Sequence, residues 1–268
     1  MKPLLFIMND IAEFLDYGWR LRRVWWFTAT ARTRARFART LLGGFWLGLS
    51  NLLSIAVLAL VYGTVFKVTD FNSYVVYLGV GLVIWNSLAA AITSAPNLLE
   101  QNANHLQNTN LNPIFYSLEE WAFQFQTFLQ SFLLVLFGLS FFQPTLLLHV
   151  LSSSWLPLVN LIVFLFWAPL VICLLGARFR DLYQLVPIVL QLVFLLSPIL
   201  YRKESLGPLS WTADINPIYR VLSPLRHSLL SGELLWNQIL VMALLNVLGI
   251  WFGCWLLKRE RKYLPFMI

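Results

Sequence analysis

Three charged residues at the start of an apolar run carry the most suggestive chemistry of the sequence. Arg178, Arg180 and Asp181 stand together, and residues 182–201 then continue for 20 residues without an acidic or basic side chain. Twenty helical residues cover about 30 Å, the hydrocarbon thickness of a bilayer. The pattern predicts a helix that starts at a membrane face and crosses. The charged knuckle, residues 178–181, is then placed to contact phosphate groups at that face.

Other catalytic or ligand-binding patterns are missing from the sequence. It has no GxxxxGK[ST] phosphate loop, so no nucleotide site of that kind is expected. The histidines lack metal-ligand spacing, so no metal site is expected: His105, His149 and His227. Asp214 and Glu233 are the acids best placed for acid–base work, and no paired partner accompanies them. No ionisable residue lies deep inside a predicted span, which argues against an ion-coupled carrier.

The composition is that of a multi-spanning membrane protein. Of 268 residues, 59% are hydrophobic and 12% are charged, with a mean hydropathy of +0.71, whereas soluble domains carry about 25% charged residues. The net charge of +7 is interpreted as a determinant of membrane orientation rather than of nucleic-acid binding. Cys173 and Cys254 both fall in apolar runs and are interpreted as packing residues.

Six charge-poor runs predict an all-α, polytopic protein with one transmembrane domain over residues 1–268. The predicted spans are residues 40–66, 74–95, 121–142, 155–175, 182–201 and 234–257. An amphipathic helix at residues 3–27 is expected to lie in the membrane interface. A polar loop at residues 96–120 is expected to contain a short helix. Residues 202–233, interrupted by proline and glycine, are expected to dip into the membrane edge without crossing.

The distribution of basic residues predicts the orientation. Six spans place both termini on one side, and that side receives 14 of the 19 lysines and arginines, against five on the other. The positive-inside rule then puts the termini, the charged knuckle and the 96–120 loop in the cytoplasm.

Several segments, in this order, resemble a known family, the membrane subunits of type-2 ATP-binding-cassette exporters. The resemblance is to the branch that exports O-antigen, capsular polysaccharide or teichoic acid. It covers nearly the whole chain, and residues 177–201 are its most specific part. The other matching features are an Arg-rich stretch leading into Leu42-Gly43 and Trp46, Asn102-Ala103-Asn104, and Asn216-Pro217 followed by Arg220 and Arg226.

The resemblance implies a permease subunit that moves a lipid-linked polysaccharide across the bacterial inner membrane. It implies a homodimer in contact with membrane lipids, with two copies of a separate cassette ATPase that bind the ATP and Mg. No cofactor is expected in this chain, and it is not expected to be an enzyme. The first and fifth spans would line the pore, and residues 202–233 would form short re-entrant helices. A coupling helix would lie near residues 98–111, where His105 to Asn108 replace the family's usual basic stretch.

Two sets of site residues follow from the resemblance. Aromatic rings stack on the C–H faces of sugars, and the candidate channel residues are Phe45, Trp46, Tyr62, Phe66, Tyr183, Phe194 and Tyr201. The alternative for each is packing or contact with lipid. The candidates for the cytoplasmic entrance or for ATPase coupling are Arg178, Arg180, Asp181, Glu100, Asn102, Asn104 and His105. For the two arginines, anchoring to lipid headgroups is the alternative.

Two other functions remain open on sequence grounds. The same fold could export a different cargo, such as a lipid or a drug. A membrane enzyme of glycan assembly is the third alternative, and it would depend on Asp214 and Glu233.

Overall fold

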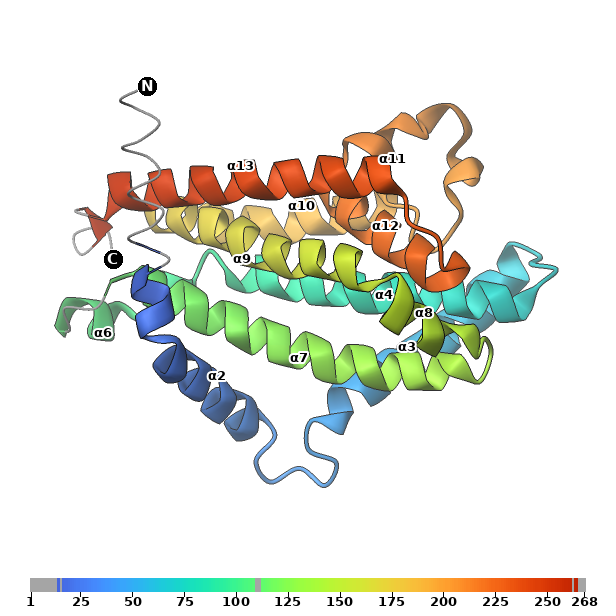
Figure 1. Ribbon diagram of the computed structural model, residues 1–268, viewed down its shortest axis with the longest axis horizontal. Helices are drawn as coiled ribbons and strands as arrows, with labels where there is room; N and C mark the ends of the chain where they lie inside the picture. Colours follow the sequence, from blue (N-terminus) through green and yellow to red (C-terminus); the bar gives the residue numbers. More distant parts are fainter. Residues whose placement is uncertain (1–13, 15, 109–111, 262, 265–268) are drawn as a thin grey trace.

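Long helices make up nearly all of the protein in a computed structural model that describes residues 14, 16–108, 112–261 and 263–264 (Figure 1). Five of them are long and apolar enough to cross a membrane: α3 (Phe45–Val65), α4 (Phe71–Ser94), α7 (Ile114–Ser140), α9 (Trp155–Arg178) and α13 (Trp236–Glu260). A sixth, α10 (Leu182–Leu196), is apolar but has only 15 residues. The predicted all-α polytopic fold is confirmed, and no strand occurs among these residues.

The bundle has two distinct ends (Figure 1). The knuckle end carries residues 178–181, the last turn of α13, and two short helices, α5 (Leu98–Gln101) and α6 (Ala103–Asn108). The far end carries α8 (Thr145–Ser152), the 3₁₀ helix η1 (Lys203–Leu209) and α11 (Trp211–Ile215). Helix α12 (Pro217–Ser231) lies inside the bundle near the far end, packed against α4, α8 and α9.

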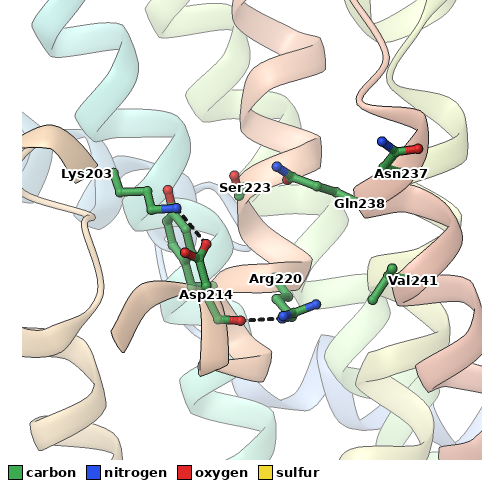
Figure 2. A pocket seen from close by; sticks show the side chains of 8 residues that line it. Lys203, Asp214, Arg220, Ser223, Asn237, Gln238 and Val241 are labelled. Atoms are coloured by element: carbon green, nitrogen blue, oxygen red, sulfur yellow. Dashed lines mark hydrogen bonds and ion pairs between the residues drawn. The ribbon is translucent and has the colours of Figure 1, made fainter. Parts of the chain in front are cut away.

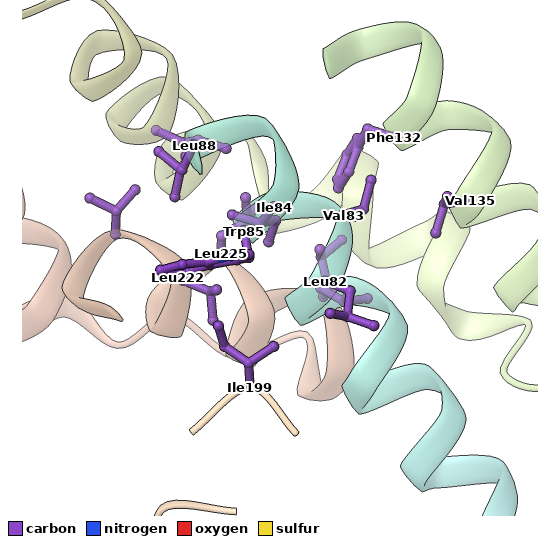
Figure 3. Packing of buried hydrophobic residues seen from close by; sticks show 14 of the residues in the cluster. Leu82, Val83, Ile84, Trp85, Leu88, Phe132, Val135, Ile199, Leu222 and Leu225 are labelled. Carbon is purple, nitrogen blue, oxygen red and sulfur yellow. The ribbon is translucent and has the colours of Figure 1, made fainter. Parts of the chain in front are cut away.

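Helix α4 is the centre of the packing. In the most apolar 18-residue stretch of α4, 72% of the residues are buried, whereas 17% are buried in the corresponding stretch of α3. Figure 3 shows its side chains meeting those of α7 and α12, with Ile84 and Leu88 fully buried beside Phe132 and Leu225. Because lipid is as apolar as these side chains, close packing rather than the hydrophobic effect holds such helices together. Helix α3 therefore lies at the edge of the bundle.

Asp70 caps the start of α4 at the far end. Its carboxylate accepts hydrogen bonds from the Ser73 hydroxyl at 2.5 Å and the Ser73 backbone N–H at 3.2 Å. Bonds to the ionised form favour that form, so the Ser73 hydroxyl, and after it the Ser73 backbone N–H, hold the pKa of Asp70 below its usual value. The cap fixes where α4 begins.

The predicted fifth span, residues 182–201, is wrong in its length. Helix α10 ends at Leu196, because Ser197 precedes Pro198 and adopts an extended conformation (φ −86°, ψ 132°). Fifteen helical residues cover only about 22 Å. The chain beyond the helix is buried: Ser197 is 1% exposed and Ile199 is 0% exposed. Non-helical backbone at membrane depth is tolerated where protein surrounds it.

The predicted loop at residues 96–120 is also too long. Helix α7 begins at Ile114, directly after Asn112-Pro113, so Glu119 and Glu120 belong to the helix and the third span does not start at residue 121. The prediction ended the loop after the acids because charges are costly inside a span. Glu120 is nevertheless 4% exposed in side chain, since it pairs with Arg32 at 2.6 Å.

Helix α2 (Arg22–Arg36) packs along α7. The predicted amphipathic helix at residues 3–27 falls partly outside the described residues, and the helix in the described part continues nine residues beyond Phe27. The charge pattern placed the end of the helix too early. Ala29 and Thr33 of α2 are buried against α7, and the exposed residues of this stretch include Arg32, Arg34 and Arg36.

Two further boundaries differ from prediction. The first span begins at Phe45 rather than residue 40, because Arg39 and Gly43 have positive φ (68° and 56°), which a right-handed helix excludes. Between the third and fourth predicted spans lies a further helix, α8, which follows Pro144. A proline at the start of a helix costs no hydrogen bond, so Pro144 can begin α8.

Candidate functional site

Arg180 of the charged knuckle and Glu100 of α5 lie together at one end of the bundle. Their side chains approach to 3.9 Å, although the two residues are 80 positions apart in sequence. Both are solvent-accessible, at 72% and 46%, and Asp181 beside them is exposed. The side chain of Tyr183 also lies near Glu100. The structure thus brings together the knuckle and the 96–120 loop, which were separate predictions.

Arg178 takes part in a different contact. Its guanidinium donates to Glu260 near the end of α13 at 3.1 Å, and the Glu260 side chain is only 5% exposed. Arg178 therefore ties α9 to α13. The neighbouring arginines of the knuckle differ in role: Arg180 faces solvent, whereas Arg178 neutralises a buried carboxylate.

This difference leads to a matched pair of predictions. Arg178→Ala is expected to lower the free energy of unfolding by about 1–3 kcal/mol, because it leaves Glu260 buried without its nearest cation. Arg180→Ala is expected to change it by less than about 0.5 kcal/mol, since exposed ion pairs contribute little. Thermal unfolding of the purified variants in detergent measures both. Equal destabilisation by the two substitutions would contradict this assignment of roles.

Helix α6 presents a polar surface beyond the knuckle. Asn104 and His105 are exposed, whereas Leu106 is buried. Asn102 instead faces the helix before it, with its side-chain amide donating to the Leu98 carbonyl at 2.8 Å. Of the predicted residues in this loop, Asn104, His105 and Glu100 are therefore accessible to a partner, and Asn102 serves the local fold.

Gly176 lets the 96–120 loop approach the end of α9. A Cβ at this position would stand 2.7 Å from both the Cα and the carbonyl oxygen of Pro96, which are backbone atoms. Gly176→Ala is therefore expected to cost about 1–3 kcal/mol. Gly253→Ala on α13 is the control, because its nearest neighbour is a side-chain methyl of Leu170 at 3.1 Å. Thermal unfolding compares the two, and a milder effect at Gly176 would contradict the prediction.

Helices α3 and α10 flank α4 and leave wide faces uncovered. On α10, Leu185, Ile188 and Leu192 are 50%, 56% and 56% exposed. The two faces also carry exposed polar side chains, unusual in membrane spans: Ser50 and Ser54 on α3, and Gln184 and Gln191 on α10. Such a surface suits a second chain or a ligand with both polar and apolar parts better than lipid alone.

A chain of amide hydrogen bonds crosses the bundle and reaches this open surface. The Asn86 amide of α4 donates to the Asn51 side-chain oxygen of α3 at 2.7 Å, and the Asn51 amide donates to the Ser131 hydroxyl of α7 at 2.8 Å. Asn86 is exposed while Ser131 is buried. Sequence reasoning missed this set, although asparagines inside charge-free runs are a usable signal.

The predicted aromatic residues do not form one cluster. Phe45 and Trp46 are exposed on α3, and Phe66 is exposed directly after it; Tyr62 stacks on Phe66 with ring centroids 5.6 Å apart. On α10, Phe194 instead packs against Trp85 of α4, at 5.3 Å.

Two predicted tyrosines stand at opposite ends of α10. Tyr183 is half-buried near the knuckle, and the Tyr201 hydroxyl donates to the Leu195 carbonyl at 2.7 Å. Within the described part of the chain, Tyr62 and Phe66 are thus the only two of the seven predicted aromatic residues whose rings contact each other.

The break after α10 is held by donors from α4 and α12. The Pro198 carbonyl accepts from the Tyr77 hydroxyl at 3.0 Å and from the Arg226 guanidinium at 2.9 Å. Tyr74 similarly donates to the Leu200 carbonyl at 2.7 Å. Arg226 is 4% exposed and lies 3.9 Å above the Tyr77 ring. These donors satisfy backbone carbonyls of the non-helical segment that follows α10.

Comparisons with known proteins identify relatives of the chain. Residues 26–230 match the family described as ABC-2 type transporter. An O-antigen export system permease protein RfbA of Klebsiella pneumoniae is 24% identical over 225 residues, covering 81% of this chain and 85% of the relative. A second protein of the same name and organism is 22% identical over 220 residues, covering 78% and 81%.

Proposed function

The chain belongs to the ABC-2 type transporter family, and from this premise we propose that it is the permease subunit of an ATP-driven exporter of a polysaccharide of the O-antigen class. It is a multi-pass inner-membrane protein with a transport role. The two relatives are named for O-antigen export, which supports this cargo over a lipid or a drug. We place the termini and the knuckle end in the cytoplasm on the charge distribution, 14 basic residues against five.

The uncovered surface of α3 and α10 carries the proposal. It combines apolar side chains with the exposed amide of Asn86 and the hydroxyls of Ser50 and Ser54. A polysaccharide presents hydroxyl groups and C–H faces together, so a path for it needs both donors or acceptors and apolar surface. Two copies facing each other across these helices would enclose such a path, which supports a homodimer.

The knuckle end supports contact with a separate cassette ATPase. The exposed polar residues Asn104 and His105 on α6 stand beyond the contact of Glu100 with Arg180. A force applied to α5 and α6 would therefore reach the start of α10, one of the two path-forming helices. In this proposal two ATPase copies bind ATP and Mg, and a lipid-linked polymer enters between the knuckles.

Copurification tests the proposed assembly. The chain should be expressed with a candidate cassette ATPase from the same genome and purified through a tag on the chain. The subunits of the complex are then counted by native mass spectrometry. The proposal expects two copies of each subunit. Failure of the ATPase to associate with the intact, folded chain would overturn it.

A further inference from the structure

A polar cleft at the far end of the bundle does not belong to the surface between α3 and α10. It has a volume of about 270 Å³ and is bounded by η1, α11, α12 and the first turn of α13. Drug-sized ligand sites have volumes of about 300–1,000 Å³. A cleft slightly below this range suits one or two sugar rings and excludes a long stretch of polymer.

The walls of the cleft are held in place by contacts around Asp214. The Lys203 ammonium lies 2.6 Å from the Asp214 carboxylate, and the Arg220 guanidinium donates to the Asp214 backbone carbonyl (Figure 2). Asn216 caps α12 with its side chain, accepting from the backbone N–H of Ile218 at 3.0 Å. These contacts join η1, α11 and α12 into one wall, so the cleft exists before any ligand enters.

The opposite wall offers hydrogen-bonding groups that have no protein partner. Asn237 and Gln238 are exposed at the start of α13, and Gln238 extends toward α12 (Figure 2). Within the described part of the chain neither amide makes a hydrogen bond, and neither does the hydroxyl of Ser223 across the cleft. Each amide supplies two donors and one acceptor oxygen.

The mixture of groups identifies the class of ligand. A phosphate or carboxylate would need donors and positive charge free to bind it. Here Lys203 pairs with the Asp214 carboxylate, Arg220 donates to the Asp214 backbone carbonyl, and the Asp214 carboxylate would itself repel an anion. A lipid chain would need an apolar lining, whereas two amides, a hydroxyl, a carboxylate and two basic side chains line this cleft together with Tyr219 and Val241. Adjacent sugar hydroxyls both donate and accept, so they match side chains that do the same. An aromatic ring adds surface for a C–H face.

We infer that this cleft is a second saccharide-contact site, which holds one or two rings of an uncharged, hydroxyl-rich glycan at the end of the protein opposite the knuckle. The inference rests on the proposed export of a polysaccharide. The site lies on the outer side in the proposed orientation. It would therefore contact the chain as it leaves the membrane and oppose its slipping back.

The test measures glycan binding by the full chain in lipid nanodiscs. The probe is the O-polysaccharide released by mild acid from the strain that encodes the chain, and binding is followed by saturation-transfer NMR. Asn237→Leu/Gln238→Leu removes both free amides and is expected to weaken binding at least tenfold. Asn72→Leu is the matched control, because Asn72 is an exposed amide at the far end that does not line the cleft. It is expected to bind as the unsubstituted chain does.

Two results would overturn the inference. One is unchanged binding by Asn237→Leu/Gln238→Leu, and the other is displacement of the glycan by 10 mM inorganic phosphate, which would identify an anion site. If the double variant does not fold, Asn237→Asp preserves the shape and removes the donor, and binding should fall at least threefold; unchanged binding would again reject the inference. Normal surface polysaccharide in a strain lacking the chain would reject the proposed function instead, so the two failures are distinguishable.

Discussion

Arg226→Leu is expected to lower the free energy of unfolding by about 2–4 kcal/mol, the sum of a lost charged hydrogen bond and a desolvated cation–π contact. Arg226 is 4% exposed, donates to the Pro198 carbonyl at 2.9 Å and lies over the Tyr77 ring. Leucine fills part of the volume but supplies no donor. Thermal unfolding in detergent measures the loss.

The same substitution is expected to reduce export at least fivefold in cells that still contain the folded protein. Without Arg226, the Pro198 carbonyl keeps the Tyr77 hydroxyl as its one side-chain donor among the described residues. The stability and export activity of Arg226→Lys are expected to lie between those of the unsubstituted protein and those of Arg226→Leu, since an ammonium lacks the planar fork of guanidinium. Arg202→Leu is the control, because Arg202 is exposed and its side chain makes no hydrogen bond or ion pair within the described residues. Equal stability of Arg226→Leu and Arg202→Leu would contradict the prediction.

Arg32→Ala is expected to detach α2 from α7 and to cost about 1–3 kcal/mol. The Glu120 carboxylate, 4% exposed, accepts from Arg32 at 2.6 Å and also from Ser94 at 3.0 Å and Gln124 at 2.7 Å. Removing one partner of a fully buried pair costs about 3–5 kcal/mol. The expected cost of Arg32→Ala is below this range because the Arg32 side chain is 42% exposed and water screens part of the interaction.

A double-mutant cycle isolates this contact. Glu120→Gln removes the charge, so Arg32→Ala in the Glu120→Gln background should cost at least about 1 kcal/mol less than in the unsubstituted protein. Arg34→Ala is the control on the same helix, since Arg34 is exposed and makes no ion pair within the described residues. Additive effects of the two substitutions would show that the pair does not hold α2 in place.

The apolar runs and charge positions were sufficient to predict the helical membrane fold and the approximate position of each span. Helix ends were predicted less well, because they depend on contacts that a charge count ignores. Residues 114–120 were assigned to a loop since Glu119 and Glu120 are acidic, but the Arg32 contact makes Glu120 compatible with α7. Proline gave the correct place for the end of α10, at Ser197-Pro198, and the prediction nevertheless extended the span to residue 201.

The candidate site was predictable only in part for a related reason. The knuckle and the 96–120 loop were each recognised from local residues, but their contact through Arg180 and Glu100 depends on the packing of α5 against α9. The Asn51–Asn86 bond and the Arg226–Tyr77 contact join segments 35 and about 150 residues apart. No local periodicity specifies such pairs.

The export of surface polysaccharide in the native strain tests the central claim most directly. The gene for this chain should be deleted and restored on a plasmid, with surface polysaccharide and lipid-linked polymer inside the inner membrane measured together. The account predicts loss of the surface polymer, accumulation of the lipid-linked polymer on the cytoplasmic side, and recovery on restoration only when the partner ATPase hydrolyses ATP. Unchanged surface polysaccharide after deletion would contradict it.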